Sequence, residues 1–345
     1  MKRLYIPAFD LENGSSERHG GVRRTEQLSR LLAYDYSAYF ARRVVFGWED
    51  MLCFIYGITH GCFGVGFKGF VVSAIVTGRL KRYLKANKLT AANCSADLEM
   101  SPGTQLYLGN YLRRAGYRYR VFPHNIEFLV PGQYGYSTNR SLAFLKQEVL
   151  VYRDAMQINT ICSYDAAVVS VFNARVDVVP YFPSTADLQA FDKVSARRKN
   201  RAVTNKVLCL GTAHNPPTRA GIEAVISFFS TQPDGKINLI VAGYGTEVFS
   251  HYQRPGISVL GGITSEALDS LLEEVDFVVL YQPPTTGFLT KLIEFNLCAV
   301  PVFINKSYIQ AVGLTAYGIY TYEGLGNIDP CSVSTIEKNF AALPV

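Results

Sequence analysis

The stretch Lys206-Val207-Leu208-Cys209-Leu210-Gly211-Thr212 begins the part of the chain in which the fold is easiest to recognise. A short apolar run followed by glycine predicts a buried strand that ends in a tight loop. An amphipathic segment at 220–229 predicts the next helix. The same alternation continues to residue 304, and it is typical of strand–helix–strand units with a parallel sheet. The fold class indicated is therefore α/β.

The remaining elements of the second half follow this pattern. Ser265 is a plausible N-cap for a helix at 265–274, because serine accepts backbone hydrogen bonds there. A further helix is expected from the turn at Thr286-Gly287 to residue 297. The strands are expected at 237–242, 257–260, 277–281 and 300–304.

The first half shows a looser version of the same alternation, with a turn at Gly20-Gly21 after the first strand. The expected strands lie at 4–9, 51–58, 91–94, 119–123, 159–162 and 176–179. The expected helices lie at 22–34, 71–85, 104–114 and 142–156.

A proline-containing segment and a charged cluster separate the halves. Pro180 to Ser184 carries two prolines, and 197–201 carries four cations. We expect domains at 1–183 and 205–345 joined by a linker at 184–204. Two doubly wound, Rossmann-like domains in tandem would face a cleft, and ligands of such sheets bind beyond the carboxyl ends of the strands.

Composition narrows the class of protein. The chain has 345 residues, 48% hydrophobic and 18% charged, so two packed cores are expected rather than disorder. The net charge of +6 suits an anionic small ligand or an acidic membrane surface at least as well as nucleic acid. With a single tryptophan, Trp48, and scattered cations, no aromatic and basic groove for nucleic acid is indicated.

The seven cysteines are scattered singly, without a CxxC pair. This argues against a zinc site and for reduced thiols in a cytoplasmic protein. No signal peptide is visible at Met1. The apolar segment 51–78 is interrupted by His60 and Lys68, so a buried strand and helix are preferred to a membrane-spanning helix.

The strongest candidate for chemistry is Thr286-Gly287-Phe288-Leu289-Thr290-Lys291-Leu292-Ile293-Glu294. A turn that opens a helix presents free N–H groups to an anion. Gly287, Lys291 and Glu294 would share one helix face, offering sites for a phosphate, a cation and a carboxylate for ribose hydroxyls. An ordinary amphipathic helix with a solvent-exposed Lys–Glu pair explains the same residues, and both interpretations stay open.

Three further signals have similar alternatives. His124, expected at a strand end, could bind a sugar hydroxyl or stabilise developing charge, or could be a simple loop histidine. Gly20-Gly21 and Gly243-Tyr244-Gly245 permit close approach of a ligand but are common in loops. The basic run from Arg79 to Lys88 predicts docking on an anionic membrane or a solvated helix face.

One motif argues against a dehydrogenase. Gly64-Val65-Gly66-Phe67-Lys68-Gly69 matches a dinucleotide-binding pattern, yet no acid occurs before Asp97 to bind the ribose. Nucleophile, zinc-protease and P-loop motifs are missing from the sequence as well.

Taken in order, the motifs resemble those of GT-B glycosyltransferases, specifically the retaining glycosyltransferase family 4 type. The resemblance extends over about residues 1–305 and is loose at 40–100. It rests on Gly20-Gly21, 123–127 (Pro-His-Asn-Ile-Glu), 163–167 (Ser-Tyr-Asp-Ala-Ala), 179–183, 210–212, 241–245 and 286–294.

The resemblance implies an N-terminal acceptor-side domain and a C-terminal domain that binds the nucleotide sugar. The acceptor would be a glycan or a lipid-linked acceptor in surface polysaccharide or glycoconjugate synthesis. His124 would be catalytic, the donor's own phosphate would assist front-face retention, and neither cofactor nor metal would be needed. The donor-binding residues implied are Gly20, Gly21, Gly211, Thr212, Asn215, Gly243, Tyr244, Ile263, Thr286, Gly287, Phe288, Lys291 and Glu294.

The chain departs from the family in places. Thr286 stands where many members carry an acid that contacts the donor sugar, and Arg219 is the candidate for their diphosphate-binding arginine. The alternatives are an inactive GT-B scaffold or glycan-binding partner, favoured by Thr286, and a sugar-nucleotide epimerase, which would need extra acids. The expected location is the cytoplasm, peripheral on the inner face of the membrane.

Overall fold

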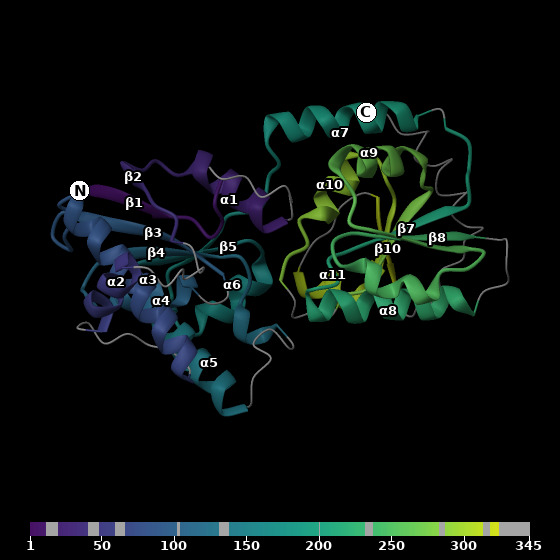
Figure 1. Cartoon of the computed structure of the whole chain (residues 1–345). Helices are drawn as coiled ribbons and strands as arrows, with labels where there is room; N and C mark the ends of the chain where they lie inside the picture. Colours follow the sequence, from purple (N-terminus) through teal and green to yellow (C-terminus); the bar gives the residue numbers. More distant parts are fainter. Residues whose placement is uncertain are drawn as a thin grey trace. The chain divides into compact units, whose positions relative to one another are not determined.

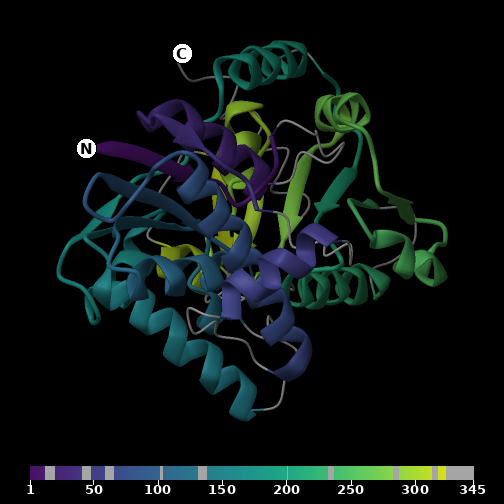
Figure 2. The same cartoon turned by 60° about the vertical axis from the view of Figure 1, so that its left-hand side comes forward.

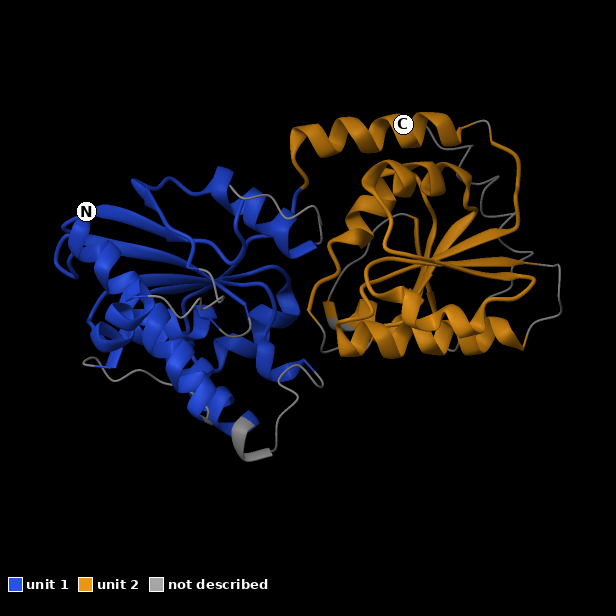
Figure 3. Cartoon of the chain, viewed as in Figure 1, with its two compact units in different colours: residues 1–182 blue, residues 183–345 orange. Residues whose placement is uncertain are grey.

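A computed structural model describes residues 1–11, 20–40, 48–58, 66–101, 104–130, 138–199, 201–231, 237–282, 287–312 and 318–323. The chain divides into two compact units, Met1–Phe182 and Pro183–Val345, called unit 1 and unit 2 here (Figure 3). In each unit a parallel sheet lies between layers of helices (Figure 1). The predicted α/β class with two doubly wound domains is confirmed.

The sheet of unit 1 has the strand order β2-β1-β3-β4-β5-β6 within the described residues. All neighbouring strands pair in parallel. The strands are β1 Lys2–Ile6, β2 Tyr36–Ser37, β3 Cys94–Met100, β4 Arg118–Pro123, β5 Gln157–Thr160 and β6 Val176–Val178.

The helices of unit 1 connect these strands. One main core forms where Leu98 and Val121 of the sheet meet Leu80 and Leu108 of the helices, all fully buried. The helices are α1 Gly20–Leu31, α2 Trp48–Ile58, α3 Gly66–Ala86, α4 Thr104–Arg114, the 3-10 turn η1 Glu127–Leu129, α5 Thr138–Asp154 and α6 Ser163–Ser170.

Unit 2 has the strand order β12-β11-β10-β7-β8-β9 within the described residues, again with parallel pairing. The strands are β7 Lys206–Leu210, β8 Asn238–Ala242, β9 Ile257–Gly261, β10 Phe277–Leu280, β11 Val302–Asn305 and β12 Ile319–Tyr322. The helices are α7 Thr185–Arg198, α8 Pro216–Ser230, η2 Thr246–Tyr252, α9 Ser265–Glu274, α10 Lys291–Leu297 and α11 Lys306–Val312.

Both faces of the unit 2 sheet are buried. Leu208 of β7 lies in a core with α7, α9 and α10, while its neighbours Val207 and Cys209 lie in a core with α8. Figure 1 shows α7 and α9 on one side of this sheet and α8 on the other. A strand covered on both faces reads as a continuous apolar run. This explains why 206–210 was recognisable as a strand.

The expectation of a strand at 51–58 is wrong, because this segment belongs to helix α2. Asp50, Cys53 and Gly57 recur at helical spacing and are the buried residues of α2. A Cβ on Gly57 would lie 1.9 Å from the carbonyl oxygen of Ala74 on α3, so the two helix backbones nearly touch. An apolar run of eight residues fits either structure, and here the packing against α3 favours the helix.

The strand expected at 91–94 begins at Cys94 and continues to Met100 instead, after a turn at 91–93. Two acids, Asp97 and Glu99, interrupt the apolar pattern by which a buried strand is recognised in the sequence. Asp97 is satisfied by a two-point hydrogen-bonded ion pair with Arg120 of β4, at 2.6 and 2.7 Å. Partners supplied across the sheet therefore make the charged strand tolerable.

The segment expected as a linker, 184–204, contains helix α7. A capping box joins Ser184 and Asp187, whose side chains each accept the other's backbone N–H. Phe191 and Val194 are buried in the core of unit 2, and the division between the units falls before Pro183. The prolines mark the boundary between the units correctly, but the segment that follows them is a helix of unit 2 and not a linker.

Two smaller expectations also fail. Thr264, rather than Ser265, caps α9, since its hydroxyl accepts the N–H of Ala267 at 3.2 Å. Gly20 and Gly21 are the first residues of α1 and not a turn.

Replacing Gly221 of α8 tests the packing of unit 2. An added Cβ would lie 2.0 Å from the carbonyl oxygen of Tyr281. We expect Gly221→Ala to lower the free energy of unfolding by about 1–3 kcal/mol, because backbone must move to relieve the clash. The matched control is Gly262→Ala, whose Cβ meets nothing within 4 Å. Urea unfolding of both variants measures this, and equal stabilities would contradict the packing described.

Candidate functional site

The carboxyl ends of β1, β3 and β4 bring a polar cluster together in unit 1. Parallel strands end at the same edge of a sheet, so residues far apart in the sequence meet there. The cluster consists of Tyr5, Thr25, Glu99 and His124, which come from β1, α1, β3 and the residue after β4. All four side chains are buried.

Glu99 is the centre of this cluster, with 0% of its surface exposed. Its carboxylate accepts hydrogen bonds from the Tyr5 hydroxyl, from Thr25 Oγ1 at 2.5 Å and from the backbone N–H of Ala8 at 3.1 Å. His124 Nε2 lies 2.8 Å from the same carboxylate. Burial alone would raise the pKa of Glu99, but the bonds from His124, Thr25 and Tyr5 outweigh it and lower the pKa below its usual range.

His124 is held from two sides. Its backbone N–H donates to Met100 O at 2.9 Å, and its ring lies 5.7 Å from the ring of Phe9 between centroids. With Nε2 engaged by Glu99, the ring orientation is set, and Nδ1 is the nitrogen through which His124 would reach a ligand. The prediction that His124 follows a strand end is confirmed. The buried carboxylate behind it was not anticipated.

Helix α1 is tied to this edge of the sheet. Thr25 bonds to Glu99, and the buried Arg24 donates to Val179 O at 2.7 Å and Pro180 O at 3.2 Å. Burial lowers the pKa of Arg24 to about 10. Gly20 and Gly21 open α1, so they lie at its N-terminus rather than in a turn.

In unit 2, backbone hydrogen bonds connect the carboxyl ends of β7, β8 and β9. Gly211 N–H donates to Ala242 O at 3.0 Å, and Gly243 N–H donates to Gly261 O at 2.9 Å. Gly243 has φ +120°, and a Cβ there would lie 2.1 Å from Gly211 O. Only glycine fits this position, because both the backbone conformation and the close approach exclude a side chain.

The other candidates from these loops lie near the same edge. Tyr244 is exposed and meets the ring of His214 edge-on, with centroids 4.6 Å apart. Asn215 is the N-cap residue of α8, although its side chain makes no capping bond. Ile263 is partly buried against the core of unit 2, and Thr212 follows Gly211 and is partly buried.

The segment 287–294 differs from the expected geometry. Gly287 has φ +79°, and α10 begins only at Lys291, so Gly287 neither opens the helix nor shares its face. Tyr308 fixes the intervening loop, since its hydroxyl donates to Gly287 O at 2.7 Å and accepts the N–H of Leu289 at 2.8 Å. Phe288 is partly buried beside it. Thr286 lies outside the described residues.

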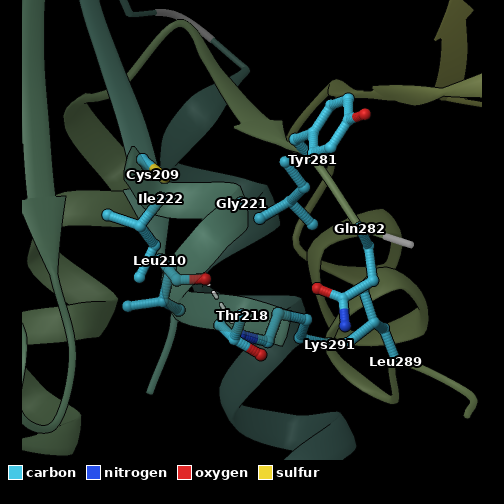
Figure 4. Close-up of a pocket in the computed structure, with 10 residues that line it drawn as sticks. Cys209, Leu210, Thr218, Gly221, Ile222, Tyr281, Gln282, Leu289 and Lys291 are labelled. Atoms are coloured by element: carbon cyan, nitrogen blue, oxygen red, sulfur yellow. Dashed lines mark hydrogen bonds between the residues drawn. The ribbon is translucent and has the colours of Figure 1, made fainter. Parts of the chain in front are cut away.

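Lys291 does not point into solvent. Its Nζ donates to Leu210 O at 2.9 Å, at the end of β7 (Figure 4). Burial lowers the pKa of Lys291, and Glu294, one turn further along α10, opposes this electrostatically. The interpretation as a solvent-exposed Lys–Glu pair is therefore wrong for Lys291.

Lys291 lines a small cavity of about 10 Å³, which is about the room needed for one water molecule. Tyr281 and Gln282, just after β10, form part of the wall, and Thr218 and Gly221 of α8 form another part (Figure 4). The Lys291 amine at the carboxyl end of β7 is a group that could bind an anionic ligand there.

Sequence reasoning missed Glu99, Tyr5 and Thr25. Glu99 lies two positions after Asp97 in the same strand, so the two carboxyl groups are on the same face of the sheet. An acid 25 positions before His124 was the available signal, but only the pairing of β3 with β4 brings the two residues together. Arg219, a weaker candidate, forms a surface ion pair with Glu223 at 3.1 Å.

Comparison with known proteins gives structural matches only. No protein-family model matches the chain, and no curated protein matches its sequence. Sucrose-phosphate synthase from Thermosynechococcus elongatus is similar in structure, with a TM-score of 0.63 and 13% identity over 99% of this chain and 90% of that one.

Two other solved structures agree. Anabaena HepE, crystallised with UDP-glucose, has a TM-score of 0.57 and 15% identity over 99% of this chain and 91% of its own. WaaG, a glycosyltransferase involved in lipopolysaccharide biosynthesis, has a TM-score of 0.54 and 10% identity over 99% of this chain and 90% of its own. Together with the two parallel sheets, these likenesses show that the chain has the GT-B fold of two Rossmann-like units.

The Glu99 cluster predicts a pH dependence of stability. Because the pKa of Glu99 is lowered in the folded state, the unfolded chain binds more protons between that value and the ordinary carboxyl pKa of about 4.3. The contribution of Glu99 is fully present above this window and is lost as the pH falls through it. Each unit of pH there costs up to about 1.4 kcal/mol.

We therefore expect Glu99→Gln to flatten the dependence of unfolding free energy on pH in this window. Urea unfolding at a series of acidic pH values measures the slope. Glu273→Gln, which removes a surface carboxylate paired with Arg197, is the control and should keep the wild-type slope. Equal slopes for the wild type and Glu99→Gln would contradict the role assigned to this carboxylate.

Proposed function

We propose that the chain is a glycosyltransferase that moves a hexose from a nucleotide-sugar donor to a glycan or lipid-linked acceptor, with retention. The observation that carries the proposal is the polar cluster around His124 in a chain with the GT-B fold. Ligands of such sheets bind beyond the carboxyl ends of the strands, so a buried histidine held there by a carboxylate supports a site for chemistry. The acceptor would belong to surface polysaccharide or glycoconjugate synthesis.

In this proposal unit 2 binds the nucleotide. HepE has been crystallised with UDP and with UDP-glucose, which makes a uridine nucleotide the first donor to test. Glu294 would accept hydrogen bonds from the ribose, and Lys291 would leave Leu210 O to meet the diphosphate. A backbone carbonyl is a weaker partner for an ammonium than a phosphate is, so this exchange is favourable.

The glycine loops of unit 2 suit a nucleotide as well. Gly211 and Gly243 pack closely against other atoms of unit 2 at the strand ends, and this packing fixes the loops that would surround the nucleotide. In the proposed arrangement the segment around Ile263 holds the base through backbone groups. Tyr244, Thr212, Asn215, Gly287 and Phe288 complete the donor site. Thr286, Gly20 and Gly21 keep their proposed donor-binding role from the resemblance alone.

His124 is the proposed catalytic residue. Its free ring nitrogen would bind a hydroxyl of the donor sugar as positive charge develops at the reacting carbon, with Glu99 keeping the ring in place. Retention would use an oxygen of the donor's own phosphate in a front-face mechanism, so no protein nucleophile is needed. Lys291 would supply the positive charge for the diphosphate, and the proposal includes no metal.

The main alternative is an inactive protein of the same fold that serves as a scaffold or binds glycans. Assaying nucleotide released from a panel of nucleotide sugars separates the two, because only an enzyme would release it. A sugar-nucleotide epimerase would instead interconvert free nucleotide sugars without an acceptor.

Replacing His124 tests the catalytic assignment. We expect His124→Ala to lower kcat by about 100-fold or more while changing the affinity for nucleotide little, because its contact strengthens only in the transition state. Steady-state kinetics with saturating donor and calorimetric titration with UDP measure the two effects. The control is His251→Ala on η2, whose side chain is exposed. A variant that retains wild-type turnover would refute the assignment.

Replacing Glu294 tests the donor site. A carboxylate that accepts hydroxyl hydrogen bonds contributes roughly 1.5–3 kcal/mol, so Glu294→Gln should weaken nucleoside diphosphate binding by about 10- to 150-fold. A helix-surface role predicts almost no change, because exposed ion pairs contribute only about 0.3–0.5 kcal/mol.

Calorimetric titration with uridine, guanosine and thymidine diphosphates makes the comparison. Glu273→Gln serves as the matched control for a surface carboxylate. If Glu294→Gln binds as tightly as the wild type with an unchanged circular dichroism spectrum, Glu294 lies outside the donor site.

A further inference from the structure

Helix α2 is attached to unit 1 in an unusual way. It packs against α3, where a Cβ on Gly57 would lie 1.9 Å from Ala74 O and a Cβ on Gly78 would lie 1.8 Å from Cys53 O. Arg79 of α3 adds an ion pair with Asp50 at 2.6 Å. The two helices lie side by side in Figures 1 and 2. Buried side chains of α3 belong to the main core of unit 1, whereas α2 contributes none of the buried side chains of that core.

The face of α2 directed away from α3 is apolar and exposed. Trp48, Met51, Ile55 and Ile58 follow the 3–4 spacing of one helix face, opposite the buried Asp50, Cys53 and Gly57. Trp48 is 69% exposed, and Phe67, in the first turn of α3, is 84% exposed. A soluble helix normally presents polar residues on this side. We call Trp48, Met51, Ile55 and Ile58 the α2 face.

Helix α3, which packs against α2, is rich in cations. Lys68, Arg82 and Lys85 of α3 are exposed, and Lys81 Nζ lies 5.2 Å from the ring centroid of Tyr56 on α2. The acids of the two helices are Glu49 and Asp50, and Asp50 is already paired with Arg79. An apolar stripe with a basic margin complements an anionic lipid surface. A second copy of this chain would bring cations against cations.

We propose that the α2 face inserts into the interface of an anionic membrane, with the cations of α3 holding lipid headgroups. The α2 face lies across the interface plane, as amphipathic helices do, and no helix among the described residues is long and apolar enough to span a bilayer. The expected basic run 79–88 thus acts with α2 and not alone. The proposal extends the proposed function, since a lipid-linked acceptor is met at a membrane surface, and it is tested separately from transfer.

Trp48 is the only tryptophan in the chain, so its fluorescence reports directly on the α2 face. The full-length protein is mixed with vesicles of phosphatidylcholine and phosphatidylglycerol, or of phosphatidylcholine alone. With the anionic vesicles we expect a blue shift of the emission and quenching by lipids brominated on the acyl chain, since the indole leaves water. Raising the salt concentration should weaken binding but leave the blue shift of the bound protein intact, because salt screens charge and not apolar burial.

Variants separate insertion from charge attraction. Ile55→Asp should weaken binding to the anionic vesicles by at least tenfold, an order-of-magnitude expectation for losing one buried apolar side chain. Arg82→Gln and Lys85→Gln should weaken it by about fivefold each. The matched control is Val171→Asp, at a residue that is 78% exposed beyond α6 in the same unit, and it should bind as the wild type does.

Several results would overturn the proposal. They are vesicle binding without a change in Trp48 emission, wild-type binding by Ile55→Asp, no binding to anionic vesicles at low salt, and a dimer in light scattering that Ile55→Asp disrupts. Circular dichroism checks folding, and Met51→Asp replaces Ile55→Asp if the latter does not fold. UDP titration of the same variants keeps the two hypotheses apart, because loss of vesicle binding with intact UDP affinity concerns the α2 face alone.

Discussion

Burial of both faces of a parallel sheet is the constraint on which this structure depends. Leu208 and its neighbours Val207 and Cys209 enter opposite cores, so the strands of unit 2 leave little place for polar side chains along their length. Polar chemistry is therefore confined mainly to the carboxyl edge, where strands stop and loops begin. The Glu99 cluster of unit 1 and the glycine loops of unit 2 lie at this edge.

Glu99 is the informative exception, since it is a charge placed inside a strand of such a sheet. Three donors, the Tyr5 hydroxyl, the Thr25 hydroxyl and the Ala8 N–H, compensate its burial together with His124, which follows β4. Removing any one partner would leave a buried carboxylate less well satisfied, so the cluster couples the position of α1 to that of His124. A site held in this way has a defined geometry before any ligand binds. The same requirement explains why Asp97, on the same strand, is paired with Arg120.

Unit 2 follows a different plan. Its loops are positioned by glycines that pack against backbone atoms, and not by a buried carboxylate. The Lys291 ammonium donates a hydrogen bond to the carbonyl of Leu210 at the end of β7. Tyr308 shapes the approach to α10 from a helix that the sequence analysis did not consider. The α2–α3 pair of unit 1 shows a third use of close packing, since glycine contacts attach a helix whose other face remains apolar and exposed.

The sequence by itself determined the α/β class, most strands of unit 2 and the position of His124, because these depend on local patterns of apolar residues and glycine. It failed at β3 and α2, where Glu99 conceals a strand and an apolar run conceals a helix. Tertiary structure alone decided these cases, since a buried acid is tolerable only with partners such as Tyr5, brought from 94 positions away. The loop before α10 likewise depends on a distant residue, because Tyr308 bonds to the left-handed Gly287. Pairings between distant segments are not encoded in any local pattern, and the geometry of the site depends on them.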